Sequence, residues 1–60
     1  MEIGKIYKIT FETGGKTLTF TGEVLALTDK IVTFSDKFKK ILNYNLKNLV
    51  SYEEVKDGNW

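Results

Sequence analysis

The stretch of this chain most able to do chemistry is SDKFKKIL, residues 35–42, in which lysines surround one phenylalanine. Lys37, Lys39 and Lys40 could each neutralise a phosphate, and Phe38 offers a ring on which a nucleobase could stack. The alternative is a hairpin loop that its lysines keep soluble, with Phe38 folded inward as a cap on the core. Lysine-rich turns also discourage edge-to-edge pairing of sheets, so both interpretations are open at this point.

The charge distribution favours the middle of the chain as a site for an anionic ligand. Residues 25–47 hold five lysines against two aspartates, a surplus of +3, although the whole chain carries only +1. Lys30 and Lys47 belong to this surplus and would join the site if folding brings them to the same side. Every basic residue is a lysine, which excludes bidentate recognition of guanine or phosphate by arginine.

Tyr44, which lies between Asn43 and Asn45, is a second candidate for contact with bases. Tyrosine can stack on a base, and asparagine can bond to the exposed edges of single strands. Tyr44 also alternates in step with Leu42 and Leu46, which favours a place in the core. The complete candidate nucleic-acid-binding set is Lys30, Lys37, Phe38, Lys39, Lys40, Tyr44 and Lys47.

Residue types that would support catalysis are missing or badly spaced. The chain has no histidine and no cysteine, which removes the commonest general base and the usual zinc ligands. Glu53 and Glu54 are neighbours in an expected strand, so their side chains point to opposite faces. Ser35 and Ser51 have no histidine to activate them. We therefore expect no enzymatic activity, no metal site and no cofactor.

The elements that must position these side chains are short β-strands. Tyr7, Ile9 and Phe11 alternate with polar residues, which is the period of a half-buried strand. The Gly14-Gly15 pair suits a tight hairpin turn, and no segment has the periodicity of a substantial helix. The expected strands cover residues 7–12, 17–27, 31–35, 41–46 and 49–55, with turns at 13–16, 28–30 and 36–40 and a 3₁₀ turn at 47–48.

The second of these strands is long and carries Gly22 in its interior, where a missing side chain usually marks a bulge or a sharp bend. Its alternation places Leu18, Phe20, Val24 and Ala26 on one face. A long strand that bends at a glycine lets a small sheet curl back on itself, and closure removes the exposed edges. The sequence thus predicts an all-β fold, a five-stranded, strongly bent antiparallel sheet that closes into a small SH3-like or Sm-like barrel.

The whole chain is short enough for one domain, which we expect over residues 1–56, with residues 57–60 as a frayed tail. No apolar run approaches the length of a membrane span, and no signal peptide is recognisable at the N-terminus. Together with the lack of cysteine, this predicts a cytoplasmic protein without a membrane partner.

Two segments resemble the Sm-like family, including its Hfq-like bacterial RNA chaperones: LTFTGEVLALTDKIVTF and YNLKNLVSYEE. The first is similar to the family's bent second strand, acidic turn and apolar third strand, and the second to the link between its last two strands. The resemblance spans residues 16–54 and implies a nucleic-acid-binding barrel that forms oligomers through its edge strands. The chain departs from the family where it opens with a strand in place of a helix, which suits an SH3-like barrel better, and where Asn45, Leu46 and Lys47 replace a Lys-His pair.

Two functions are therefore expected from the sequence. One is a small nucleic-acid-binding protein that contacts phosphates through the mid-chain lysines and stacks an aromatic ring on a base. The other is a protein-interaction or oligomerisation module without nucleic acid, which the near-zero net charge, thin core and sheet edges favour.

Overall fold

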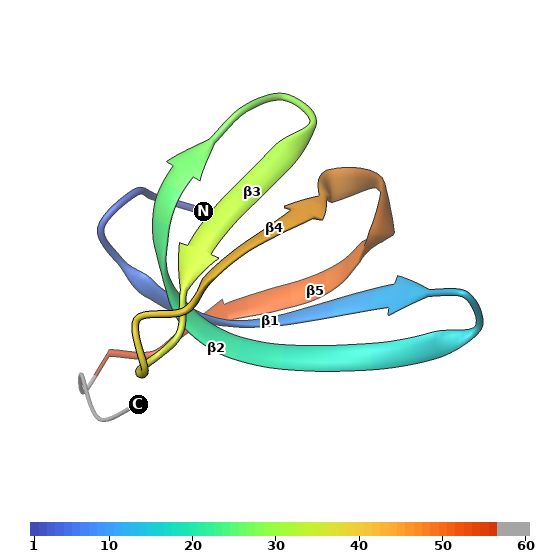
Figure 1. Ribbon diagram of the computed structural model, residues 1–60, viewed down its shortest axis with the longest axis horizontal. Helices are drawn as coiled ribbons and strands as arrows, with labels where there is room; N and C mark the ends of the chain where they lie inside the picture. Colours follow the sequence, from blue (N-terminus) through green and yellow to red (C-terminus); the bar gives the residue numbers. More distant parts are fainter. Residues whose placement is uncertain (57–60) are drawn as a thin grey trace.

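The computed structural model describes residues 1–56, which form five strands and one short 3₁₀ helix (Figure 1). The frayed tail expected over residues 57–60 lies outside the described residues. Each strand lies within a residue or two of the bounds that the alternation predicts. The elements are β1 (Ile6–Thr13), β2 (Lys16–Leu27), β3 (Ile31–Ser35), β4 (Ile41–Asn45), η1 (Leu46–Asn48) and β5 (Leu49–Glu54).

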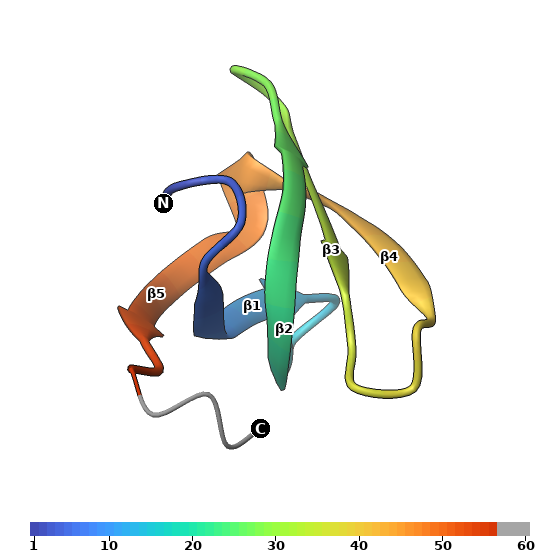
Figure 2. The ribbon, with the colours of Figure 1, turned by 90° about the vertical axis from the view of Figure 1, so that its left-hand side faces the viewer.

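All five strands belong to one antiparallel sheet with the order β4-β3-β2-β1-β5. β2 is the shared strand, because its first part pairs with β1 and its last part pairs with β3. The strand curves strongly along its length, so the two parts of the sheet face each other (Figures 1 and 2). The predicted all-β, bent antiparallel sheet is confirmed. Within residues 1–56 β4 and β5 are the two edges and do not pair, so closure into a barrel stays a prediction.

Gly22 is needed because β2 and β3 approach each other too closely for a side chain. A Cβ atom at this position would lie 2.7 Å from the carbonyl oxygen of Ser35 and 2.8 Å from Cδ2 of Phe34. Both distances are well inside van der Waals contact, so only glycine fits. The glycine therefore brings the end of β3, and the loop that follows it, against the middle of β2.

The regular alternation of β2 ends at a β-bulge. The pairing between β2 and β3 shifts register between Val24 and Ala26, which leaves Leu25 as the extra residue. As a result, Ala26 is exposed, although the alternation predicts it on the core face with Val24. A one-residue slip reverses the face of every following side chain, and the prediction for Ala26 is wrong for this reason.

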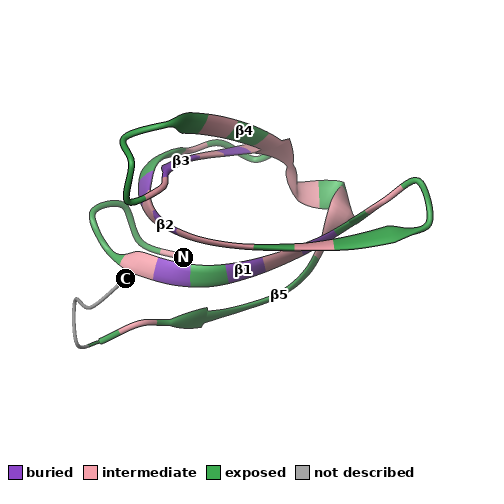
Figure 3. Cartoon of the chain, turned by 60° about the horizontal axis from the view of Figure 1, so that its bottom comes forward, coloured by how far each residue is buried: buried purple, intermediate pink, exposed green. Residues whose placement is uncertain are grey.

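The core lies between the two parts of the bent sheet. Figure 3 shows the buried stretches on β1, β2 and β3, whereas β5 is mainly exposed. Partly buried side chains from β4, η1 and β5 pack against this core. Its buried apolar residues are Tyr7, Ile9, Phe11, Val24, Val32 and Phe34.

Within the described part of the chain, none of the helical turns is long or apolar enough to cross a membrane.

Candidate nucleic-acid interface

The loop between β3 and β4, residues 36–40, is held in one shape by Asp36. The Oδ1 atom of Asp36 accepts hydrogen bonds from the backbone amides of Phe38 and Lys40, each at 2.9 Å. The backbone of Asp36 adds two more bonds, in which its carbonyl accepts from the Lys39 amide and its amide donates to the Lys40 carbonyl, each at 3.0 Å. An aspartate that bonds its own loop in this way is typical of tight turns, and it fixes where the loop side chains point.

Phe38 projects from this loop into solvent. Its side chain is 79% exposed, the largest value among the exposed apolar side chains of residues 1–56. The Nζ atom of Lys37 lies 5.4 Å from the centre of the ring, within the range of a cation–π contact. The ring is therefore not folded inward as a cap on the core, and one of its faces is accessible to a planar ligand.

Lys39 has a backbone φ of 67° and is the non-glycine residue of the described chain with a positive φ. This left-handed conformation costs an ordinary side chain about 1–2 kcal/mol, and glycine or asparagine usually occupies it. A lysine here places a third ammonium group on the loop at a measurable cost in stability. Residues kept in unfavourable backbone conformations are found preferentially at functional sites.

The loop lysines are not neutralised by the protein. Among the described residues, no carboxylate lies within 4.0 Å of Lys37, Lys39 or Lys40, and all three are exposed. Lys5, in contrast to the loop lysines, has carboxylate partners: its Nζ atom lies 2.8 Å from Oε2 of Glu2 and 3.9 Å from Oε1 of Glu54.

The ion pair between Lys5 and Glu2 also shifts the pKa values of both side chains. The hydrogen bond from Lys5, assisted by its charge, lowers the pKa of Glu2, and the same bond and charge raise the pKa of Lys5. Lys5 thus already has an anionic partner, whereas the loop lysines are available to an external anion.

Lys30 and Lys47 do not join the loop lysines. Both lie at the opposite end of the β3-β4 hairpin, where the Leu46 amide donates to the Lys30 carbonyl at 2.7 Å. Lys30 belongs to the turn between β2 and β3, and Lys47 belongs to η1. The mid-chain surplus of charge is therefore divided between two ends of one hairpin, and the expectation of a single surface does not hold for these two residues.

Tyr44 packs on the core with its ring. Its centroid lies 4.7 Å from that of Phe11 and 5.2 Å from that of Phe20, in stacked or tilted geometry. This arrangement supports the interpretation that Tyr44 belongs to the core, and not the interpretation that it stacks on a base. Asn43, by contrast, is exposed and accepts a hydrogen bond from the Thr33 hydroxyl at 2.6 Å.

A groove that sequence reasoning missed lies between the loop and β2. It has a volume of about 330 Å³ and is lined by Thr19, Phe20, Thr21, Asp36, Lys37 and Phe38. The strand contributes hydroxyl groups and a half-buried ring, and the loop contributes a cation, a carboxylate and an exposed ring. The alternation of threonines along β2 predicts a polar outer face for this strand. The sequence does not indicate that this face lies beside the loop of residues 36–40.

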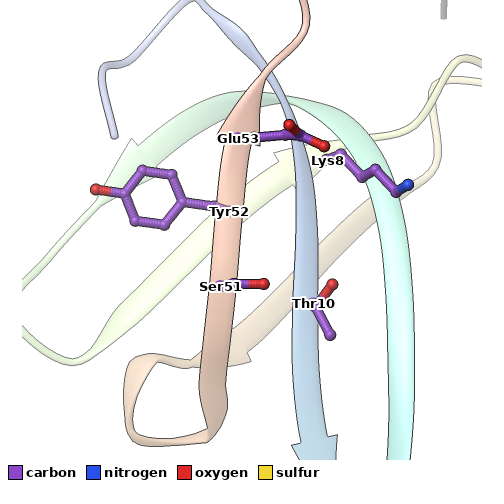
Figure 4. Close-up of a pocket in the computed structure, with 5 residues that line it drawn as sticks. All are labelled: Lys8, Thr10, Ser51, Tyr52 and Glu53. Carbon is purple, nitrogen blue, oxygen red and sulfur yellow. The ribbon is translucent and has the colours of Figure 1, made fainter.

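A second hollow continues the outer face onto β1 and β5, with a volume of about 370 Å³. Figure 4 shows the side chains of Ser51 and Glu53 reaching from β5 toward Thr10 and Lys8 on β1, while the Tyr52 ring points away on the other side. The two hollows are neighbours, because Lys8 pairs with Thr21 and Thr10 pairs with Thr19 across the β1-β2 ladder. The hydroxyls of Thr10 and Thr19 are 3.3 Å apart.

The outer face of β2, with its threonine hydroxyls, therefore connects the groove beside the loop with the hollow over β1 and β5, and the carboxylates of Asp36 and Glu53 also line these hollows. Together the two hollows can offer ammonium groups and hydroxyls to phosphates and an exposed ring to a base. Over residues 1–56, no group of three or more histidine, cysteine, aspartate or glutamate side chains could hold a metal ion. Comparisons with protein-family models, curated proteins and solved structures found no match to this chain.

Proposed function

We propose that this protein binds single-stranded nucleic acid through the loop of residues 36–40. Phe38 stacks on an unpaired base, and Lys37, Lys39 and Lys40 contact the phosphates on either side. The observation that carries the proposal is the 79% exposed Phe38, which lines a groove together with Lys37 and shares its loop with two further exposed lysines. Leaving a phenylalanine ring this exposed forfeits burial of roughly 1.5–3 kcal/mol, which argues for a role outside the core.

The exposed ring favours single strands over duplexes. A ring can stack on a base only when that base has left its own stack, as in loops and single strands. Lysine ammonium groups contact phosphates as point charges and add no base specificity of their own. The hydroxyls of Thr10, Thr19 and Thr21 extend the surface along which the backbone of the nucleic acid would run, whereas Lys8 lies opposite Glu53 in the sheet.

The strand arrangement supports a finer statement about the fold. The order β4-β3-β2-β1-β5, the curved β2 and the 3₁₀ turn between β4 and β5 suit a small SH3-like or Sm-like barrel. We propose that the interface lies on a barrel of this kind, as the resemblance of residues 16–54 to the Sm-like family also implies.

The test is fluorescence anisotropy with labelled single-stranded RNA and DNA and with the corresponding duplexes. Phe38→Ala removes the stacking ring and should weaken single-strand binding about 5- to 150-fold, because one base–aromatic stack is worth about 1–3 kcal/mol. Phe38→Tyr should keep most of the affinity. Ile3→Ala, which shortens an exposed apolar side chain outside both hollows, is the control. Equal affinity of Phe38→Ala and the unchanged protein would overturn the proposal.

A second candidate function, self-association, rests on the two edges of the sheet. The hydrogen bonds at both ends of the β3-β4 ladder direct the backbone groups of Ile41 and Asn43 away from β3. The bond from Val55 to Ile6 in the β1-β5 ladder likewise directs those of Tyr52 and Glu54 outward. These unpaired groups can accept a further strand.

The charges beside the two edges are opposite, since lysines precede β4 and glutamates end β5. Pairing of β4 with β5 of another copy would therefore be electrostatically favourable. Light scattering tests this candidate: a mass above that of the monomer that falls with salt supports it, and a monomer at every concentration contradicts it.

A further inference from the structure

The groove beside Phe38 contains one group that phosphate binding does not explain, the carboxylate of Asp36. Its Oδ1 atom accepts both loop amides, from Phe38 and from Lys40. Each oxygen of a carboxylate can accept two hydrogen bonds, so Oδ1 is saturated. Within residues 1–56 no hydrogen bond reaches the second oxygen, Oδ2. A carboxylate repels phosphate but is a strong acceptor for N–H donors.

The groove also contains groups of the kinds that can contact a nucleobase. Phe38 offers the face of a ring, and Phe20, whose ring packs against Phe34 and Tyr44 on the core side of β2, forms part of the apolar lining. The hydroxyls of Thr19 and Thr21 can donate or accept at the periphery of a base. The Nζ atom of Lys37 lies over one face of the Phe38 ring, so a base would stack on the other face and Lys37 could contact the phosphate of the same nucleotide.

We infer that the groove selects the base that it stacks, and that it prefers guanine over uracil through hydrogen bonds donated to Asp36 Oδ2. This inference rests on the proposed single-strand binding. Guanine presents its ring N–H and its amino group side by side, and both can donate to a carboxylate oxygen. Uracil presents one N–H between two carbonyl oxygens, which repel the carboxylate. Adenine and cytosine present one amino group beside a ring acceptor and bind with intermediate affinity.

One substitution at Asp36 should change the preference for the bound base and preserve the conformation of the loop. In Asp36→Asn the side-chain carbonyl still accepts the amides of Phe38 and Lys40, because asparagine forms the same turn. The second position becomes an NH₂ donor, which bonds to the carbonyl oxygens of uracil and not to the donors of guanine. We therefore expect Asp36→Asn to reverse the order of affinities for guanine and uracil and to leave the loop conformation unchanged.

The experiment uses short DNA strands of about seven nucleotides in which every nucleotide but the central one is abasic, so one base alone can enter the groove. The central base is guanine, hypoxanthine or uracil. Hypoxanthine differs from guanine only by the missing amino group, so this comparison needs no protein variant. The unchanged protein should bind guanine about tenfold more tightly than uracil, as expected for a hydrogen bond to a charged acceptor, with hypoxanthine between them.

Asp36→Asn should reduce the guanine-to-uracil ratio of affinities to one or below. The ratio is the readout because the substitution also removes a negative charge and strengthens phosphate binding to every strand equally. An unchanged melting temperature verifies that the loop is kept.

The outcomes separate this inference from the function on which it rests. Binding that depends on Phe38 but is equal for guanine, hypoxanthine and uracil overturns the base preference and leaves the proposed function standing. A preference that persists in Asp36→Asn also overturns the role of Asp36. The absence of binding to any single strand, for the unchanged protein as for Phe38→Ala, overturns the proposed function itself.

Discussion

Lys39 is the residue at which stability and the proposed function conflict most directly. Its φ of 67° is unfavourable for a lysine, and the hydrogen bonds around Asp36 hold it there. The ammonium group is exposed and, within residues 1–56, no carboxylate lies within 4.0 Å of it. The proposed function assigns this ammonium group a phosphate contact.

Replacing Lys39 with glycine should therefore have opposite effects on stability and binding. The substitution relieves the left-handed strain and should raise the free energy of unfolding by about 1 kcal/mol. The melting temperature would rise by about 4–8 °C for a domain of this size. Loss of one phosphate contact should at the same time reduce the salt slope of single-strand binding by about 0.7. Urea denaturation and anisotropy measure the two effects, and a destabilised variant would contradict the strain argument.

At the scale of the strands and turns, β2 positions the candidate site. Its curvature and the close approach at Gly22 bring the end of β3 against its middle, so the loop of residues 36–40 forms a wall of the groove. The bulge at Leu25 then shifts the pairing beyond that point. The groove thus depends on the close approach of the two strands at Gly22.

Gly22→Ala should damage the fold and the groove together. The added Cβ would lie 2.7 Å from the Ser35 carbonyl oxygen, and β3 can avoid it only by moving away from β2. Overpacking of this kind costs about 1–3 kcal/mol, a large part of the stability of a small domain. Thermal unfolding followed by circular dichroism measures the loss. Thr17→Ala, at an exposed position of the same strand, is the control and should change the melting temperature little. Equal melting temperatures for both variants would contradict the role given to Gly22.

Much of this element-level arrangement could be predicted from the sequence. Alternation placed Tyr7, Ile9 and Phe11 in the core, and the turn residues set the strand bounds within a residue or two. The position of Lys30 could also have been predicted, because the turn of residues 36–40 fixes the hairpin register and places Lys30 opposite Leu46.

The groove and the exposure of Phe38 could not be predicted in this way. A phenylalanine in a turn has no alternation partner that decides between inside and outside. The groove depends on the distance between β2 and the loop, and a glycine within a strand does not by itself show which segment approaches it.

At the scale of the whole molecule, the positions of the lysines say more about a possible anionic ligand than the net charge does. The net charge of +1 gives no sign of an anionic partner. The structure divides the mid-chain lysines into a loop group beside an exposed ring and a second group, Lys30 and Lys47, at the far end of the hairpin. This division provides two pairs of substitutions that are equal in charge and differ only in place.

The central claim is that the loop of residues 36–40 carries the binding, and the most direct test is the salt dependence of single-strand binding in two matched double variants. The unchanged protein should show a slope of log affinity against log salt of about −2.1 for three phosphate contacts, a roughly twentyfold loss between about 50 and about 200 mM salt. Lys37→Gln with Lys40→Gln should reduce the slope to about −0.7, whereas Lys30→Gln with Lys47→Gln should leave it near the original value. Equal slopes for the two double variants would contradict the account.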